Sequence, residues 1–332
     1  MKVSIIIPLY NVAPYIKRCL DSVAAQTYIG DMECILVDDC GTDNSLGIAR
    51  KWIDNYTGRI KFFIFCHTSN QGLSAARNTG IQVATGEYVY FLDSDDAITP
   101  ECINILVGLA YKYPHADFIQ GNTKQGPPGL ITYPFRVDAP EHTADNILKS
   151  KLILTYTMIT ACNKLIKKTF ISANGLFFPI GIVHEDVYWL YFVEKHTKEV
   201  AFTNRGTYCY YANENSIMNN SSDENVNRRI SGYTVSINAM TDDVLKNGTT
   251  SKYQRRYVVD AILNYQQYVS SLHSFRHWIS YWTCMLSLAW KVRRKLSFYR
   301  LLLFNCMMPP LCFLTRHEWW LWRIRHYIIS RI

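Results

Sequence analysis

The stretch of sequence that decides the fold is Tyr88-Val89-Tyr90-Phe91-Leu92-Asp93-Ser94-Asp95-Asp96, in which apolar residues lead directly into a cluster of acids. The apolar part predicts a buried strand, and the acids follow where that strand reaches the edge of its sheet. α/β proteins bind ligands at this edge. Crowded carboxylates repel one another unless a cation neutralises them, and hard oxygen ligands favour Mg²⁺ or Mn²⁺. The stretch therefore predicts a divalent metal site that can hold a diphosphate.

Strands and helices alternate in the sequence before this stretch. Apolar runs predict strands over Val3 to Pro8, Cys34 to Val37 and Ile60 to Cys66, and helical spacing predicts helices over residues 15–23, 45–55 and 73–84. This alternation predicts an α/β fold with a mostly parallel sheet flanked by helices on both faces. Chemistry is then expected at the carboxyl ends of the strands.

The pattern changes after Pro100. A helix to about Lys112 and a strand at residues 117–119 continue the layer, whereas residues 121–140 are rich in Gly and Pro and predict a loop or hairpin. Helical spacing returns at Asp223, and we expect helices as far as Ile332 with a break at Pro309-Pro310. The predicted organisation is a domain over residues 1–220 and a helical C-terminal region over residues 221–332.

Composition narrows the class of protein. The chain has 332 residues, of which 48% are hydrophobic, and its ten cysteines contain no C-x-x-C pair. With no secretory signal before the first strand, we expect a reducing, cytoplasmic compartment. No apolar stretch reaches the roughly 20 residues that a membrane-spanning helix needs. The formal charge of +8 is uneven, and the last part of the chain predicts an acidic partner.

Two further segments lie at predicted strand ends. Pro8-Leu9-Tyr10-Asn11 follows the first strand and Asp38-Asp39 follows the second, so neighbouring strand ends should bring them together. A carboxylate and the Tyr10 ring could then hold a nucleobase, although residues 39–43 also fit a turn and a helix cap. In Asn70–Gly80, Gly72 permits a tight turn and Arg77 can reach a phosphate or an acidic partner; a solvated helix surface is the alternative.

These segments together resemble the family 2 glycosyltransferases, which are inverting enzymes with the GT-A fold. The resemblance covers roughly the first hundred residues, through the segments at 3–11, 37–43, 70–80 and 88–96. It implies a nucleoside diphosphate sugar as donor, bound by a set of residues that begins with Asp39 on the base and Asp93 near the ribose. The other implied donor-binding residues are Pro8, Tyr10, Arg77 and Ser94, with Asp95 on an Mn²⁺ or Mg²⁺ ion.

A second part of the resemblance lies further along the chain. Val183-His184-Glu185-Asp186 is similar to the family's Glu-Asp motif, which implies that Asp186, next to Glu185, is the general base that deprotonates the acceptor hydroxyl. A helix N-terminus is the alternative explanation for these acids. Ala161–Ile166 also resembles the family, as a border of the acceptor cleft, so Lys164 and His184 are candidate acceptor-side residues.

The C-terminal helices lie outside the strong resemblance. Tryptophans at 278, 282, 290, 319, 320 and 322 are interleaved with basic residues, a composition that favours a membrane surface. Packing of a helical cap on the domain is the alternative, and nothing resembles a nucleic-acid module. We expect a cytoplasmic enzyme, attached to the inner face of the membrane, that transfers a sugar, expected to be UDP-linked, to a saccharide acceptor.

The acceptor expected from the resemblance is linked to a polyprenyl diphosphate, as in bacterial cell-surface polysaccharide synthesis. Two other functions stay open at this point. A sugar nucleotidyltransferase also uses a doubly wound sheet with acidic metal ligands, although it usually has a Gly-rich loop after the first strand, which Pro8-Leu9-Tyr10-Asn11 lacks. A non-catalytic protein that binds nucleotide sugars is the other alternative.

Overall fold

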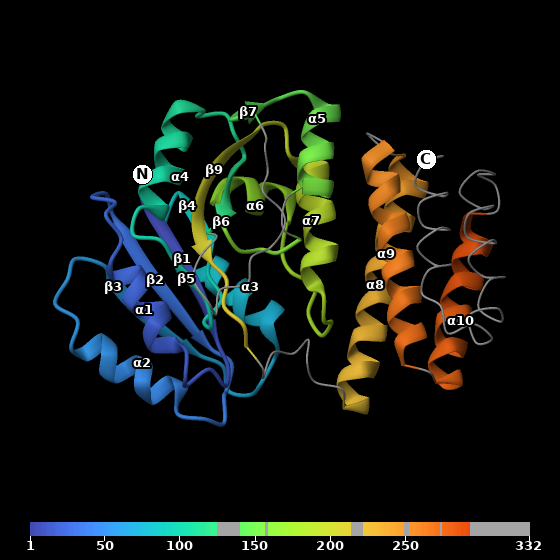
Figure 1. The fold of residues 1–332 in the computed structure, drawn as a ribbon, viewed down its shortest axis with the longest axis horizontal. Coiled ribbons are helices and arrows are strands. Elements are labelled where there is room, and N and C mark those ends of the chain that lie inside the picture. The colour runs from blue at the N-terminus through green and yellow to red at the C-terminus, as the bar shows by residue number, and fades with distance from the viewer. Residues whose placement is uncertain (125–139, 157–158, 214–221, 249–251, 273, 293–332) are drawn as a thin grey trace. The chain divides into compact units, whose positions relative to one another are not determined.

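The computed structural model describes residues 1–124, 140–156, 159–213, 222–248, 252–272 and 274–292 (Figure 1). The chain divides into two compact units. The first consists of Met1–Gly181 with Phe192–Asn219, and the second of Ile182–Tyr191 with the described residues that follow Asn220. The first unit contains the sheet, and the second contains long helices. The predicted break at Pro309-Pro310 and most of the predicted loop at 121–140 lie outside the described residues.

One nine-stranded sheet forms the centre of the first unit, in the order β3-β2-β1-β4-β8-β6-β9-β5, with β7 paired to β9. Its strands are β1 (Val3–Leu9), β2 (Met32–Asp38), β3 (Lys61–Cys66), β4 (Tyr88–Phe91), β5 (Ala97–Ile98), β6 (Phe118–Thr123), β7 (His142–Thr143), β8 (Lys164–Lys167) and β9 (Val200–Cys209). Its helices are α1 (Ile16–Ala24), α2 (Ser45–Asp54), α3 (Leu73–Val83), α4 (Cys102–Lys112), α5 (Asn146–Lys151), the π-helix η1 (Leu152–Tyr156) and α6 (Lys168–Asn174).

The first four strands are parallel, as the strand and helix alternation predicts. β1 pairs with β2 and β4, and β2 pairs with β3. Because parallel crossovers are right-handed, the steps from β1 to β2 to β3 place α1 and α2 on one face, and the reversed step to β4 places α3 on the other. The strand order therefore reverses between β1 and β4. Open α/β sheets bind ligands at such a switch point, beside the carboxyl ends of the strands.

The second half of the sheet is mixed rather than mostly parallel, which corrects the expectation for this part. β8 is antiparallel to β4 and β6, and β9 is antiparallel to β5 and β7. Antiparallel neighbours need no helical crossover, so the regular alternation of strands and helices ends near Pro100. The only parallel pair among these described strands is β6 with β9, whose register shifts after Gln120. The α/β class with helices on the sheet is confirmed.

Small residues let α3 lie very close to the sheet. A Cβ atom at Gly80 would collide with the side chain of Ile6 in the centre of β1, and Ala76 on the same helix is fully buried. Close approach fixes the helix over strands that are buried along their whole length, such as β1 and β2. The position of α3 matters because this helix carries Arg77.

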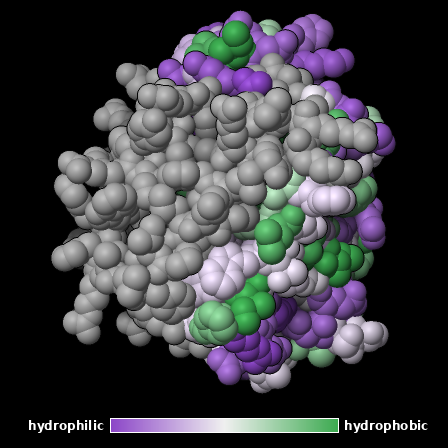
Figure 2. All heavy atoms as spheres, turned by 90° about the vertical axis from the view of Figure 1, so that its right-hand side faces the viewer, coloured by the Kyte–Doolittle hydropathy of each residue, from purple (hydrophilic) through white to green (hydrophobic). Residues whose placement is uncertain are grey.

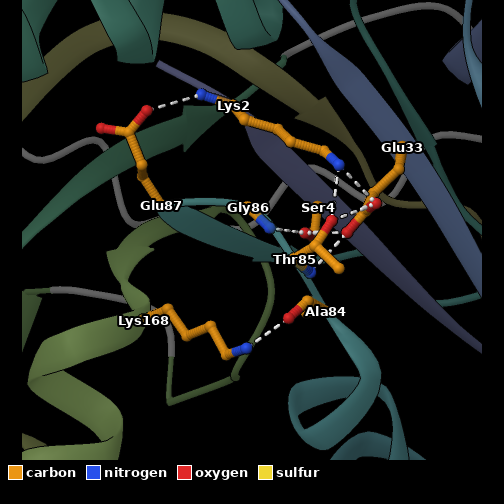
Figure 3. Close-up of polar contacts among 8 residues, drawn as sticks. All are labelled: Lys2, Ser4, Glu33, Ala84, Thr85, Gly86, Glu87 and Lys168. Carbon is orange, nitrogen blue, oxygen red and sulfur yellow. Dashed lines mark hydrogen bonds and ion pairs between the residues drawn. The ribbon is translucent and has the colours of Figure 1, made fainter.

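A polar cluster ties the amino ends of β1 and β2 to the turn before β4 (Figure 3). The buried carboxylate of Glu33 accepts hydrogen bonds from the Ser4 hydroxyl (2.6 Å) and from the backbone N–H of Thr85 (2.7 Å), and it forms an ion pair with Lys2 (2.9 Å). Burial alone would raise the pKa of Glu33, but hydrogen bonds from Ser4, Thr85 and Lys2 outweigh it and lower the pKa to about 2. The cluster lies at the end of the sheet opposite the acidic loop.

We expect Glu33→Gln to lower the free energy of unfolding by about 1–3 kcal/mol at neutral pH, because the amide nitrogen leaves buried donors without an acceptor. The folded pKa of about 2 lies below the ordinary value of 4.5, so the carboxylate stabilises the fold above pH 4.5 and this contribution is lost as the pH falls towards 2. Urea unfolding at neutral pH and at about pH 3 measures the difference, which should shrink in acid.

Glu87→Gln is the matched control, because the Glu87 side chain is 65% exposed and lies 3.9 Å from the terminal ammonium. Its loss should stay below about 1 kcal/mol. Equal losses for the two variants would contradict the assigned role of Glu33.

The second unit contains α8 (Asp223–Asn247), α9 (Lys252–Ser271) and α10 (Phe275–Val292), which continue the helical spacing read from Asp223 onward. α7 (Glu185–His196) begins in this unit and ends in the first. Aromatic rings pack together in the core of the second unit. Tyr233 stacks on Tyr265, and Tyr265 meets Tyr281 edge-on. Across the described segments, no helix combines the length and apolarity needed to cross a membrane.

Candidate functional site

The carboxyl ends of β1 and β2 meet, as their predicted positions in the sheet require. The side-chain oxygen of Asn11, directly after β1, accepts hydrogen bonds from the backbone N–H groups of Thr42 (2.7 Å) and Asp43 (3.2 Å) after β2. Asn11 adopts a left-handed conformation (φ 52°), which asparagine tolerates better than most residues. Pro8 is buried within β1, whereas Tyr10 is 45% exposed beside this junction. An aromatic ring at the switch point is therefore open to a ligand.

Asp39 holds the turn that leads into α3, more than thirty residues later in the chain. Its Oδ1 atom accepts from the backbone N–H of Gln71 (2.8 Å) and lies 2.7 Å from Nδ1 of His67, and its Oδ2 atom accepts from the N–H of Gly72 (2.7 Å). His67 is held in turn by Thr79 on α3 (2.9 Å). The Asp39 side chain is almost fully buried. Asp39 therefore orders the turn before α3, and its contact with a nucleobase stays a prediction.

α3 carries Arg77 to the acidic loop. The helix starts after Gly72, whose φ of 89° suits glycine alone, and its first turns are small and buried. The Arg77 side chain is buried, and its Nη2 atom lies 2.9 Å from Oδ1 of Asp93. Its guanidinium also lies 5.2 Å from the centre of the Phe178 ring. Arg77 therefore reaches an acidic partner, which is one of the two interpretations that the sequence offered.

The loop that contains Asp93, Ser94, Asp95 and Asp96 is held from several sides. Ser94 and Asp96 are buried, whereas the side chain of Asp93 is 31% exposed. Oδ2 of Asp95 accepts from the amide of Asn213 (2.8 Å), which lies after β9. The strand end and the loop therefore fix each other, and Asp93 and Asp95 remain at the surface that faces the switch point.

The buried side chain of Asp96 joins the loop to β9 and to the residues that follow it. Its two oxygens accept from the Tyr208 hydroxyl (2.6 Å) and from the backbone N–H of Tyr211 (2.9 Å). Arg18 of α1 donates to the backbone oxygen of Asp95 (2.6 Å), and its guanidinium lies 3.6 Å from the centre of the Tyr211 ring. A cation beside the loop offsets part of the charge of the carboxylates.

The pKa values of Asp95 and Asp96 reflect burial and the charges of neighbouring carboxylates. Burial and the charges of Asp93 and Asp95 raise the pKa of Asp96 to about 8, despite its hydrogen bonds from Tyr208 and Tyr211. Burial and the charge of Asp93 raise the pKa of Asp95 as well. Both shifts mean that burial and the mutual repulsion of the carboxylates disfavour their charged forms. A bound cation would relieve this repulsion.

The residues present fit a divalent ion that is shared with a ligand. Within the described ranges, no group of three or more His, Cys, Asp and Glu side chains is arranged to hold a metal. Mg²⁺ and Mn²⁺ in phosphate-binding sites take one or two carboxylates from the protein and further oxygens from the phosphates. Asp95, with Asp93 beside it, can supply such carboxylates. The chemistry of the donor set thus agrees with the predicted metal, which stays a prediction.

Lys164 lies in an unexpected environment for an acceptor-side residue. It is fully buried at the start of β8, and its ammonium donates to the backbone oxygens of Thr160 and Cys162. The cation therefore serves the packing of its own segment, and a contact with an acceptor stays a prediction. The family-like segment around it also contains Asn163, which is buried with a left-handed backbone (φ 59°) and accepts a hydrogen bond from Thr207 (2.7 Å).

Glu185, Asp186 and His184 belong to the second unit. Glu185 and Asp186 lie in the first turn of α7, where the helix dipole favours negative charge. Their position therefore also fits the alternative explanation, in which these acids only stabilise a helix N-terminus. Glu185 is buried and Asp186 is half-buried, and Oδ1 of Asp186 accepts from the backbone N–H of Val187 (2.9 Å). The convergence of Asp186 with the donor-side residues of the first unit stays a prediction.

His184 precedes these acids with a left-handed backbone (φ 64°), and its ring stacks at a tilt 5.0 Å from Tyr233. Burial and the charge of Arg229 lower the pKa of His184 to about 4, so the imidazole is neutral at physiological pH. A Cβ atom at Gly232 would collide with the carbonyl oxygen of Val183, which shows that α8 packs closely against the start of this segment. His184 can therefore present hydrogen-bonding groups without a charge.

The sequence analysis missed the residues that hold the site together. Arg18, His67, Tyr208, Tyr211 and Asn213 all contact the predicted site residues, and none stands in the segments that suggested the site. No local pattern marks them, because each contact joins elements that are far apart in the chain.

The sheet and the helices on it define an α/β protein with the GT-A fold. A family model, Glycosyl transferase family 2, matches residues 4–171. The chain belongs to this family, and the family assignment made from the four segments is confirmed.

Comparison with individual proteins agrees with this assignment. The chain is 29% identical over 222 residues to the uncharacterized glycosyltransferase YibD of Escherichia coli, covering 65% of this chain and 63% of YibD. In fold it is similar to residues 1–349 of TarS from S. aureus in complex with UDP-GlcNAc (TM-score 0.69, 20% identity, 87% and 81% of the two chains). It is also similar to the mannosyltransferase PcManGT of Pyrobaculum calidifontis in complex with GDP-Man and Mn²⁺ (TM-score 0.56, 16% identity, 99% and 85%). The chain thus spans less than two thirds of the length of YibD.

Asn78, next to Arg77, offers a test of how the site is assembled. Its side chain is buried, donates to the backbone oxygen of Phe178 (2.8 Å) and accepts from the N–H of the same residue (2.8 Å). We expect Asn78→Ala to leave both groups unpaired, to cost about 1–3 kcal/mol of unfolding free energy and to speed amide hydrogen exchange at Phe178.

Asn55→Ala is the control, since Asn55 is exposed and bonds only a backbone oxygen of its own helix. An unchanged amide exchange rate at Phe178 in the Asn78 variant would contradict the idea that Asn78 of α3 holds the backbone at Phe178 in place.

Proposed function

We propose that the protein is an inverting glycosyltransferase that moves a sugar from a nucleoside diphosphate sugar to the hydroxyl group of a saccharide. The observation that carries the proposal is the arrangement at the switch point, where Arg77 pairs with Asp93 at 2.9 Å and Asp95 lies in the same fixed loop. A charged edge of this kind, at the place where α/β sheets bind nucleotides, suits the diphosphate of a donor. Membership of the family supports the reaction type.

We assign the donor site to the first unit. Tyr10 offers an exposed ring for the base, Asp39 and Pro8 shape the floor below it, and Asp93 with Ser94 lies towards the ribose. The UDP-GlcNAc complex of a protein with the same fold supports UDP as the nucleotide. Arg77 orients Asp93, and the buried Asp96 orients Asp95 through the loop they share.

Asp95 would hold a divalent ion, Mn²⁺ or Mg²⁺. When bound, such an ion stabilises the negative charge of the departing diphosphate by an amount on the order of several kcal/mol. The Mn²⁺ complex of a mannosyltransferase with this fold supports the choice of metal. The raised pKa values of Asp95 and Asp96 support it independently, since neighbouring carboxylates favour a cation.

Asp186 is the proposed general base, with Glu185 beside it. The acceptor oxygen attacks the anomeric carbon, the bond from that carbon to the diphosphate oxygen breaks with its electron pair leaving on the nucleotide, and the hydroxyl proton passes to Asp186. Inversion requires the base on the face opposite the leaving group. The dipole of α7 helps Asp186 to stay ionised before the transfer. His184 and Lys164 are proposed on the acceptor side, with His184 neutral.

The acceptor is proposed to be a saccharide linked to a polyprenyl diphosphate, in the synthesis of a bacterial cell-surface polysaccharide. We further propose a cytoplasmic protein that is attached to the inner face of the membrane through its C-terminal helices, and a division into a catalytic domain over residues 1–220 and a helical region after it. Uneven charge supports the attachment, because the basic residues after Ser271 have almost no acidic counterparts.

Incubation with Mn²⁺ and a panel of nucleotide sugars tests the reaction type. We expect release of UDP, or of another nucleoside diphosphate, that increases on addition of a lipid-linked saccharide. Pyrophosphate formed from a sugar phosphate and a nucleoside triphosphate would instead indicate a nucleotidyltransferase. Tight donor binding with no release in the presence of the saccharide acceptor would favour a non-catalytic binding protein.

Two substitutions separate the proposed roles. Asp186→Asn should lower the rate of transfer by about 10²–10⁴-fold with unchanged donor affinity, because it removes only the base. Asp95→Asn should weaken donor binding in Mn²⁺ and leave binding in EDTA unchanged. Donor affinity is measured by calorimetry and turnover by nucleotide release. The exposed Asp54, at the end of α2, provides the matched control Asp54→Asn. Full turnover in Asp186→Asn would overturn the assignment of the base.

A further inference from the structure

The outermost helix described in the second unit has three distinct faces. Trp278, Tyr281, Met285 and Leu288 of α10 are buried and pack towards α8 and α9. Phe275 (64% exposed), Ile279 (48%), Leu286 (62%) and Trp290 (69%) form a second, exposed face, which we call the α10 stripe. Their spacing of four, seven and four residues keeps them on one side of the helix. Polar residues, among them Ser280, Thr283 and Ser287, lie beside the stripe.

The α10 stripe needs an explanation because large apolar side chains rarely gather in the open on a soluble surface. Figure 2 faces the side that carries α10 and shows hydrophobic side chains next to hydrophilic ones on the part of the surface that is not grey. The helix is held firmly against α8, since Lys291 forms an ion pair with Asp242 (2.9 Å) and bonds Asn238 (3.0 Å). The stripe therefore faces away from the side of α10 that packs on α8 and α9.

Charge identifies the partner that suits this stripe. Residues 272–332 contain ten of the 35 basic residues of the protein and one of its 27 acidic residues, Glu318. The rest of the chain has 25 basic and 26 acidic residues, so its formal charge is −1, and the last 61 residues carry +9. α10 itself contains no Asp or Glu. The net positive charge of the protein thus comes from the part of the chain that includes this helix and the residues after it.

We propose that α10 docks on an anionic lipid bilayer, with the α10 stripe inserted among the lipid headgroups and acyl chains and with the exposed Arg276 on the phosphates. Helices that lie in a bilayer interface combine an aromatic and aliphatic face with lysine and arginine on the polar side. Tryptophan in particular favours the interfacial region. Because the opposite face of α10 is packed in the core, the helix would lie along the surface, with the stripe and not the buried face in contact with lipid.

The same charges disfavour the other occupants of the stripe. A second copy docked there would bring together two regions of +9, and electrostatic repulsion opposes this. Residues 293–332 carry eight basic residues and one acidic residue, so they would add like charge beside Arg276. An anionic bilayer supplies both the apolar interior and the opposite charge. The inference names the surface that the proposed membrane attachment uses, and it does not depend on the donor chemistry.

Flotation of the full-length protein with vesicles tests the docking. We expect binding to vesicles of phosphatidylcholine with about 30% phosphatidylglycerol, weak binding to pure phosphatidylcholine, and a decrease at high salt. The double variant Ile279→Ser and Leu286→Ser should bind at least about tenfold more weakly, because it removes two exposed apolar side chains from the membrane contact. Arg276→Glu should reduce only the part of binding that depends on phosphatidylglycerol.

The matched control is Ile29→Ser with Ile147→Ser, which alters two isoleucines of the first unit that are 89% and 61% exposed. It should bind vesicles like the unmodified protein, and circular dichroism should show unchanged helix content in every variant. Equal binding by the α10 variant and the control overturns the proposal. Absence of vesicle binding by the unmodified protein also overturns it, whether light scattering then shows a dimer that the α10 variant loses or a monomer whose stripe is covered by its own chain. Nucleotide release is unaffected by either result, so the two proposals fail separately.

Discussion

The carboxylate of Asp39 fixes the element on which the site depends. It accepts hydrogen bonds from the N–H groups of Gln71 and Gly72, so a residue that follows β2 holds the turn that leads into α3. α3 is thereby oriented over β1, and Arg77 on this helix meets Asp93 after β4. Asp39 thus helps to set the position of α3, and α3 brings Arg77 to the acidic loop. The arrangement needs no contact between Asp39 and Asp93 themselves.

Two ends of the sheet use charge for different purposes. At the amino ends of β1 and β2, Glu33 is surrounded by donors and by Lys2, and its pKa is lowered to about 2. At the carboxyl ends, burial and the charge of Asp93 raise the pKa values of Asp95 and Asp96. The first arrangement satisfies its charge and stabilises the fold. The second leaves negative charge poorly compensated, as sites that bind cations commonly do.

Much of the fold was predictable from the sequence, and the reason is local. The strands and helices of the first 112 residues follow from hydrophobic spacing, and the family follows from segments at strand ends, where chemistry has a fixed place. The antiparallel pairing of β8 with β4 and of β9 with β5 was not predictable. The regular alternation of strands and helices has ended in this part of the chain, so it no longer indicates which strands pair. The same holds for the supports of the site. Asn213 and Tyr208 contact residues more than a hundred positions earlier, and no spacing pattern records such pairs.

The bond between Asn78 and Phe178 joins residues that are 100 positions apart. During translation the first four strands leave the ribosome while Phe178, Tyr208 and Asn213 are still to be synthesised. The nascent chain can therefore build the parallel half of its sheet early, since those contacts are comparatively close in sequence. The loop at residues 93–96 gains its hydrogen bonds from Tyr208, Tyr211 and Asn213 only after the last strand of the sheet, β9, has been synthesised.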